Sequence, residues 1–468
     1  MASTISTPAH PQDQNKPLTI IWRDQADPAT YEEARTRNLF NAQSPRRFPI
    51  AVVYVRNTSD IVRTVKLSIE KGCRISVRAG GHSYASWSVR DDAILVDLGG
   101  LFKDPIFDDN TGIVRVTPNT TGQELASYLA GRNRFFPVGH CPGVGLGGFL
   151  LGGGMGWNCN NWGWACEQVK AIDVVTANGS LLRADAQQNS DLFWAARGGG
   201  PAFPGVVSYF YLQTRPASKW MFSSGYVYPM RHYKTAFHWA LKIPSYLTDG
   251  LEIVAVGSYH PDIKEPCIMI AFTAYGDQEN LLRDVLQRIE ESHPKGKVAH
   301  WFCEETSIQQ ELDKKDRAFP HGHRYFVENS WLQSDIDVAA VLETAFTALP
   351  NNKSMVLWQS MVPCSRRKLP EMALSMQSDN YFAFYGIWED ENDDHHCQSV
   401  ISEIMSKVEK YSVGSYLGEL DFRVRKSKYW QESQQTSILE IRRKWDPKGR
   451  ICGCLGLEEM DNHEGKHV

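Results

Sequence analysis

Two glycine-rich loops carry the residues of this sequence that are best suited to chemistry. The first loop is Arg78-Ala79-Gly80-Gly81-His82-Ser83-Tyr84. The second runs from Gly139 to Trp157 and begins with the chemically reactive pair His140-Cys141. Consecutive glycines permit positive φ and let backbone N–H groups approach a phosphate closely. The two loops therefore predict a dinucleotide whose pyrophosphate is threaded against backbone amides.

The glycines also admit other interpretations. Either loop alone is consistent with a tight packing turn and a structural histidine, but two such loops in this order favour a cofactor. The spacing G-x-G-x-x-G at Gly143, Gly145 and Gly148 does not indicate a nicotinamide site, because Cys141-Pro142 precedes it instead of a strand. A P-loop is excluded, since the sequence has no G-x-x-x-x-G-K-[ST] motif.

The two loops resemble those of the berberine-bridge-enzyme-like branch of the vanillyl-alcohol-oxidase flavoproteins. The matching motifs are R-x-G-G-H-S-Y and G-x-C-P-x-V-G-x-G-G-x-x-x-G-G-G-x-G. A third match runs from Asp191 to Gly200 and is followed by Gly205-Val206-Val207. The resemblance is strong over residues 45–217, weak over 221–424, and partial at Lys444-Trp445-Asp446-Pro447.

The resemblance implies FAD that is attached covalently at two points, by His82 to the flavin 8α-methyl group and by Cys141 to flavin C6. It implies that Val144 lies beside the flavin, where a small valine goes with oxygen access, and that Tyr84 faces the substrate. The other residues expected to bind the cofactor come from the same loops and from the third match: Arg78, Ala79, Gly80, Gly81, Ser83, Pro142, Gly145, Gly147, Gly148, Gly152, Gly153, Gly154, Gly205 and Val206.

The sequence departs from the family at the position of the catalytic base. Where the family often has Y-x-N-Y-x-D, this chain has Tyr416-Leu417-Gly418-Glu419-Leu420-Asp421. Glu419 thus replaces a tyrosine, and a carboxylate there is able to deprotonate an alcohol as hydride leaves for the flavin. A solvent-facing Glu419 at a strand end is an equally good interpretation. His140 is expected near the ring. There it either tunes the flavin or assists proton transfer, and a packing role is an equally good interpretation.

The elements around these motifs predict an α+β fold. Short apolar runs at 50–55, 74–78, 93–98 and 113–117 indicate strands, and Ser59 is expected to cap a helix that ends near Lys71. Asn178-Gly179 predicts a hairpin. Beyond residue 220 strand-like runs alternate with helical segments, which indicates an antiparallel sheet covered by helices.

We therefore expect three parts. Residues 1–220 form a two-subdomain PCMH-type FAD-binding domain, as the resemblance implies, with its core at 45–217. Residues 221–424 form the substrate domain, and 425–468 return to the FAD domain. Aromatic residues alternate along one run of the substrate domain, where they either face a cavity or, more often in such runs, belong to the core: Tyr381, Phe382, Phe384, Tyr385 and Trp388.

Composition excludes several classes of function. A formal net charge of −4 gives no basic field for nucleic acid or an anionic membrane. No apolar stretch is long enough to cross a membrane and no signal peptide is visible, so we expect a cytoplasmic protein. Ten dispersed cysteines do not predict a disulfide framework. We expect no metal site, because neither Cys452-x-Cys454 nor Asp393-Asp394-His395-His396 offers enough partners.

Three functions remain. The first is an oxidase that takes two electrons from an alcohol or activated C–H of a small molecule and reduces O₂ to H₂O₂. The second is a dehydrogenase on the same scaffold that uses another electron acceptor. The third is a flavin-binding protein with little turnover. Val144 favours the oxidase, and the substrate is not determined by the sequence.

Overall fold

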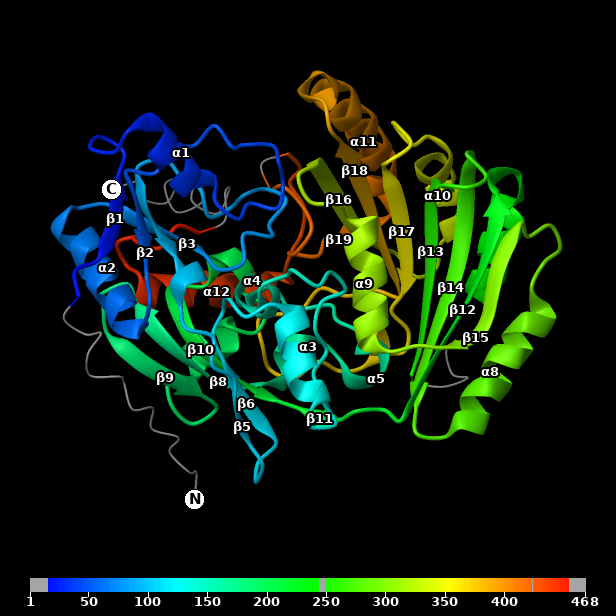
Figure 1. Ribbon diagram of the computed structural model, residues 1–468, viewed down its shortest axis with the longest axis horizontal. Coiled ribbons are helices and arrows are strands. Elements are labelled where there is room, and N and C mark those ends of the chain that lie inside the picture. The colour runs from blue at the N-terminus through cyan, green and yellow to red at the C-terminus, as the bar shows by residue number, and fades with distance from the viewer. Residues whose placement is uncertain (1–15, 244–249, 423, 454–468) are drawn as a thin grey trace.

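The protein has two lobes that lie side by side, each built on its own β-sheets (Figure 1). This computed structural model describes residues 16–243, 250–422 and 424–453. Strands β1 to β11 and the C-terminal helix α12 belong to the first lobe, and strands β12 to β19 form one large sheet in the second. Helices and antiparallel sheets mixed in this way confirm the α+β fold class.

The first sheet of the first lobe positions the loop that contains His82. Its order is β1 (Thr19–Trp22), β2 (Ala51–Tyr54), β4 (Ala93–Asp97), β3 (Arg74–Arg78), and the last three strands are parallel. Helix α2 (Thr58–Glu70) makes the crossover from β2 to β3. The prediction that Ser59 caps this helix is wrong. Asn57 is the cap, because its backbone is extended and its side chain accepts from the Asp60 N–H.

A second, antiparallel sheet of five strands lies beside the first. Its order is β5 (Ile106–Asp108), β6 (Ile113–Val116), β10 (Gly205–Gln213), β8 (Val169–Thr176), β9 (Leu181–Asp185). The hairpin predicted at Asn178-Gly179 joins β8 to β9, with Gly179 at φ +82°. Helix α3 (Gly122–Ala130) begins at a capping box between Thr121 and Glu124. The short strands β7 (Arg134–Phe135) and β11 (Arg215–Pro216) form a separate antiparallel pair in this lobe.

The second lobe is one antiparallel sheet of eight strands. Its order is β15 (Ala299–Glu305), β12 (Trp220–Pro229), β14 (Pro266–Gly276), β13 (Leu251–Tyr259), β17 (Met355–Ser360), β18 (Asn380–Trp388), β16 (Arg324–Leu332), β19 (Ser412–Gly414). Four helices cover one face: α7 (Tyr233–Lys242), α8 (Glu279–Ser292), α10 (Val338–Thr347) and α11 (Asp394–Val408). The other face turns toward the first lobe.

Strand β18 shows how the two faces of this sheet differ. Phe382, Phe384 and Trp388 belong to the core under the four helices. Tyr381 and Tyr385 belong to a second cluster, which also contains residues of the first lobe. The aromatic run therefore serves both purposes, because successive side chains of a strand point to opposite faces.

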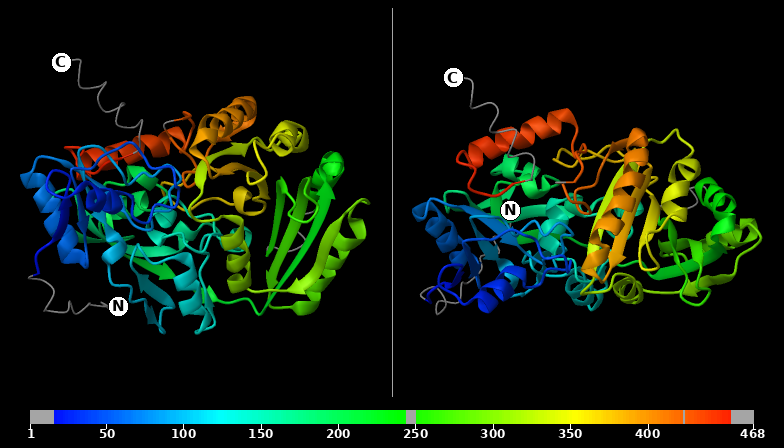
Figure 2. Two further views of the ribbon diagram at one scale, coloured as in Figure 1. Left: turned by 45° about the horizontal axis from the view of Figure 1, so that its top comes forward. Right: turned by 90° about the horizontal axis from the view of Figure 1, so that it is seen from above.

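Two helices join the lobes. Helix α9 (Ile308–Ala318) follows β15 and contacts α3 of the first lobe, and Figure 1 shows it at the junction. Helix α12 (Glu432–Trp445) returns to the first lobe (Figure 2) and packs on α6 (Ser190–Ala195), where the Trp445 indole donates to Asp191 at 2.9 Å. The chain then forms a bridge from Ile451 to Ile75 of β3.

Candidate active site

One cavity of about 330 Å³ brings the two glycine-rich loops together with the second lobe. The first loop follows β3 and contributes His82, and the second precedes α4 (Leu146–Leu151) and contributes Cys141. A Cβ built on Gly143 would lie 3.7 Å from Cδ2 of His82, so the loops are in contact at this point. Residues that are far apart in sequence therefore line the same space.

His82 is held as a neutral imidazole. Its ring stacks on Phe40 with centroids 4.0 Å apart, and His321 meets the same phenyl ring edge-on. Burial lowers the pKa of His82 to about 4, since the charged form loses its hydration. At neutral pH the ring keeps a free lone pair on one nitrogen, which is the form that acts as a nucleophile.

Cys141 is held as a protonated thiol. Burial, and after it the carboxylate of Glu419, raises the pKa of Cys141 to about 12, while the positive charge of Lys315 opposes the shift. Any reaction of this sulfur therefore requires a base to take its proton.

The glycines let the two loops approach more closely than any side chain would permit. A Cβ on Gly80 would lie 2.8 Å from the backbone nitrogen of Gly145, and one on Gly147 would lie 2.9 Å from the Cβ of Ala79. Gly148 differs, because a Cβ there would meet no atom of the described residues within 4 Å, apart from its chain neighbours and its own helix backbone. Gly148 lines the cavity, so its missing side chain leaves room for a ligand rather than for packing.

Glu419 lies in the same cavity and does not face bulk solvent. Its Oε2 accepts a hydrogen bond of 2.8 Å from the Tyr385 hydroxyl and a second hydrogen bond from the Tyr381 hydroxyl. Burial raises the pKa of Glu419, and the two tyrosine donors oppose that shift. Of the two interpretations of Glu419, the structure favours the one in which the carboxylate is available as a base.

Tyr84, His140 and Val144 also line this cavity. The Tyr84 ring lies 6.2 Å from that of Tyr385, between centroids, and burial raises the pKa of its phenol well above the ordinary value. His140 packs against Trp157 at 4.3 Å between ring centroids. Burial lowers the pKa of His140 to about 3, so its ring is uncharged at neutral pH.

Known proteins resemble this chain over nearly its whole length. Residues 49–185 match the FAD binding domain family. The FAD-linked oxidoreductase janO of Penicillium janthinellum is 38% identical over 94% of this chain and 98% of its own length, and nodO of Hypoxylon pulicicidum is 37% identical over 94% and 97%. The chain belongs to the FAD-linked oxidoreductases. It is therefore an enzyme, and its cofactor is FAD.

Solved structures show the same fold. The BBE-like 1 protein of Physcomitrella patens covers 93% of this oxidoreductase with a TM-score of 0.78 at 19% identity, over 95% of its own chain. The carbohydrate oxidase of Microdochium nivale covers 93% with a TM-score of 0.76 at 21% identity, over 95% of its own chain. The fold that the resemblance to berberine-bridge-enzyme-like flavoproteins implied is thus confirmed.

The cavity of this FAD-linked oxidoreductase fits the cofactor at both loops. Most residues expected to bind FAD line it: Ala79, Gly80, Gly81, His82, Ser83, Cys141, Val144, Gly145, Gly147, Gly148, Gly152 and Gly205. Arg78 also borders it, but its guanidinium donates to Asp97 at 2.8 Å and to the carbonyls of Ala34 and Arg35. Its role is to fix α1 (Pro28–Thr36) against β3.

Four residues of the expected set lie outside the cavity lining. They are Pro142, Gly153, Gly154 and Val206. Val206 is buried under the first sheet, because alternation along β10 turns Gly205 and Val207 toward the cavity instead. Gly153 and Gly154 have positive φ, and a Cβ on either would press on Leu374 or Ala165, so they make the turn behind the loop.

The second lobe contributes lining residues that were not predicted from sequence. Lys315 and Phe319 come from α9 and its end, and Leu357 and Gln359 come from β17. For Leu357 and Gln359 the only signal in the sequence was the alternation of side chains along β17. No local pattern indicated that Lys315 and Phe319 would line the cavity. Their proximity to the loops follows from the packing of the two lobes.

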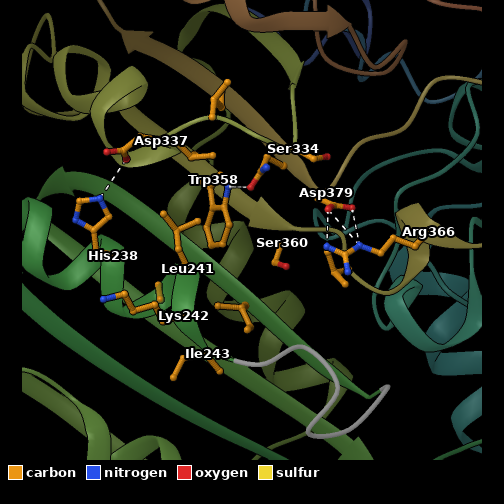
Figure 3. A pocket seen from close by; sticks show the side chains of 16 residues that line it. His238, Leu241, Lys242, Ile243, Ser334, Asp337, Trp358, Ser360, Arg366 and Asp379 are labelled. Atoms are coloured by element: carbon orange, nitrogen blue, oxygen red, sulfur yellow. Dashed lines mark hydrogen bonds and ion pairs between the residues drawn. The ribbon is translucent and has the colours of Figure 1, made fainter.

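A second cavity of about 680 Å³ lies on the helix-covered face of the large sheet (Figure 3). Its opposite charges pair with each other, His238 with Asp337 at 3.1 Å and Arg366 with Asp379 at 2.8 Å. The Trp358 indole donates to Asn380 at 3.0 Å. This second cavity is lined by neither of the glycine-rich loops, so we assign no chemistry to it.

Two further observations concern residues 16–243, 250–422 and 424–453. No helix in this part of the chain is both long and apolar enough to cross a membrane. No group of three or more His, Cys, Asp and Glu side chains in it is arranged to hold a metal ion. Cys454, one half of the C-x-C pair, lies outside the described residues.

Proposed function

We propose that this FAD-linked oxidoreductase is an oxidase with a doubly attached flavin, which removes a hydride from an alcohol or activated C–H of a small molecule. The observation that carries the proposal is the meeting of His82, Cys141 and Glu419 in one cavity. When bound, FAD supplies a two-electron acceptor that O₂ reoxidises with release of H₂O₂.

His82 and Cys141 are the expected points of attachment. The formation of each bond would remove one hydrogen from the residue and one hydrogen from FAD, and O₂ would accept both hydrogens with their two electrons as H₂O₂. The neutral ring of His82 suits this reaction. The Cys141 thiol must first lose its proton, and Glu419 is the carboxylate whose charge acts on it most strongly.

Glu419 is the expected base in turnover. Its Oε2 is held by Tyr381 and Tyr385, so the carboxylate is fixed in position before the substrate arrives. Its raised pKa makes it a better proton acceptor than an exposed glutamate. It takes the substrate proton while the hydride leaves in the other direction.

The choice of oxidase over dehydrogenase rests on Val144 and on relatives. Val144 lines the cavity, and the resemblance associates a small side chain at this position with access of O₂ to the flavin. The xylooligosaccharide oxidase of Thermothelomyces thermophilus is 35% identical over 41% of this chain and 37% of its own length. This match lies in part of the chain only, so it supports an oxidase and leaves the substrate open.

A denaturing gel viewed by flavin fluorescence tests the attachment. Wild type, His82→Ala, Cys141→Ala and the double variant are compared, with absorbance spectra of the native proteins. We expect flavin to stay with the denatured wild type and with each single variant and to leave the double variant. Release of all flavin from denatured wild type would contradict covalent attachment.

Oxygen consumption then separates the two kinds of turnover. H₂O₂ formed in step with the consumed O₂ supports the oxidase. Substrate-reduced flavin that reacts only with a quinone or dye would establish the dehydrogenase instead.

A further inference from the structure

The wall of the cavity that the large sheet and α9 contribute is apolar except for two tyrosines, Gln359 and Lys315. It is formed by β13, β17 and β18 and by the end of α9, and Val254, Leu357 and Phe319 contribute apolar side chains. Phe319 packs edge-on against Tyr385 at 5.1 Å between ring centroids. The hydroxyls of Tyr381 and Tyr385 both donate to Glu419, so they are already in use.

Gln359 is a polar exception in this wall. It pairs with Val254 of β13 and with Tyr381 of β18, and only 3% of its surface is exposed. The nitrogen of its side-chain amide, Nε2, is buried and has no hydrogen-bond partner among the described residues. A buried donor without a partner costs free energy, so its retention beside a cavity indicates a group that a ligand completes.

Lys315 is a second exception. It lines the same cavity from α9, and within the described part of the chain its ammonium group makes no hydrogen bond or ion pair. Its neighbour Lys314 behaves differently, since its ammonium donates to Glu311 at 2.7 Å and Lys314 does not line this cavity. The charge of Lys315 instead acts inside the cavity, on Cys141 and His140.

We infer that Lys315 and Gln359 bind an acceptor oxygen, a carbonyl or a carboxylate, on an otherwise apolar substrate whose reacting carbon lies at Glu419. This inference rests on the proposed function and names the substrate class of the same site. Two donors set in an apolar wall match such a molecule. An oligosaccharide needs many paired donors and acceptors, and this wall does not supply them.

Binding to the oxidised holoenzyme tests the inference through changes in the flavin absorbance spectrum. The probes are 2-naphthoate, which carries a carboxylate, 2-acetonaphthone, which carries a carbonyl, and 2-methylnaphthalene, which carries no acceptor. Cellobiose serves as the sugar. We expect the first two to bind about tenfold or more tightly than 2-methylnaphthalene, and their ranking separates the anionic from the neutral acceptor.

Variants assign the preference to the two residues. Lys315→Met and Gln359→Leu are expected to remove most of it without changing the flavin content, and Lys315→Arg is expected to keep it. Lys314→Met is the matched control and is expected to bind all probes as wild type does.

Tightest binding of cellobiose, equal binding of 2-methylnaphthalene and 2-naphthoate, or unchanged selectivity in Lys315→Met would overturn the inference. The readout is binding, so such a result leaves the oxidase proposal standing. A holoenzyme that selects acceptor probes but never forms H₂O₂ from any donor would contradict the oxidase proposal alone.

Discussion

The Tyr385 hydroxyl donates a hydrogen bond of 2.8 Å to Oε2 of Glu419, which lies 34 residues later in the chain. Tyr385 belongs to β18, and Glu419 belongs to the irregular segment that follows β19. The contact joins the large sheet to the position where the family often has a tyrosine base. It places a carboxylate against the cavity of the glycine-rich loops, and the first two predictions depend on it.

Glu419→Gln should lower kcat by about a hundredfold or more, which is the usual contribution of a positioned general base. The amide keeps the size of the side chain but accepts no proton at neutral pH. The measurement is the rate of flavin reduction by substrate without oxygen, together with flavin content. Glu403→Gln, at an exposed position of α11, is the control. A loss of less than tenfold would remove Glu419 from the role of base.

The pH dependence of kcat/KM should carry an acid limb that reports Glu419. Only the ionised carboxylate accepts a proton, so the rate rises with pH through the limb. Because burial raises the pKa of Glu419, the limb should lie above the ordinary value of 4.5. Tyr385→Phe removes a donor that lowers this pKa, and the limb should move to still higher pH. Tyr411→Phe, at an exposed tyrosine, should leave it in place.

Gly80→Ala and Gly148→Ala should separate the packing of the loops from the binding of the cofactor. The methyl group added in Gly80→Ala would press on the Gly145 backbone, and we expect a loss of about 1–3 kcal/mol in the free energy of unfolding. Gly148→Ala should not lower that free energy, since the new methyl group meets no described residue outside its own helix, but should lower the FAD content.

Denaturant titration and flavin absorbance are the two measurements for these glycine variants. Gly131→Ala is the control, because a Cβ there would meet only the Tyr128 carbonyl oxygen at 3.9 Å. Full FAD loading in Gly148→Ala would show that the open space beside Gly148 is not part of the cofactor site.

Val144→Ile should slow the reaction of reduced enzyme with O₂ by about tenfold, which is about 1.4 kcal/mol in the barrier. The larger side chain narrows the space beside the cofactor without adding polarity. Stopped-flow reduction without oxygen, and reoxidation by O₂, are measured separately. Reduction should keep its rate. If reoxidation is also unchanged, O₂ reaches the cofactor by another route.

The sequence by itself determined the features that depend on neighbouring residues. The two glycine-rich loops, the hairpin at Asn178-Gly179 and the strands β2, β3, β4 and β6 were predicted, because positive φ, turn chemistry and apolar runs are local properties. The short strands β1 and β5 were missed. FAD as cofactor was implied by the resemblance of those loops, with His82 and Cys141, to berberine-bridge-enzyme-like flavoproteins. The helix start at Asn57 was missed, since Asn57 and Ser59 are both good caps and only the backbone angles choose between them.

Only the tertiary structure decided which side chains share the cavity. Glu419 was open to two interpretations until Tyr381 and Tyr385 were seen to donate to it. Lys315 and Gln359 enter the site because α9 and β17 pack against loops that are far away in sequence. Val206 lies outside the cavity, because the alternation of side chains along β10 turns it into the core of the first sheet. Contacts of this kind come from burial of large apolar faces between lobes, which no local pattern of residues specifies.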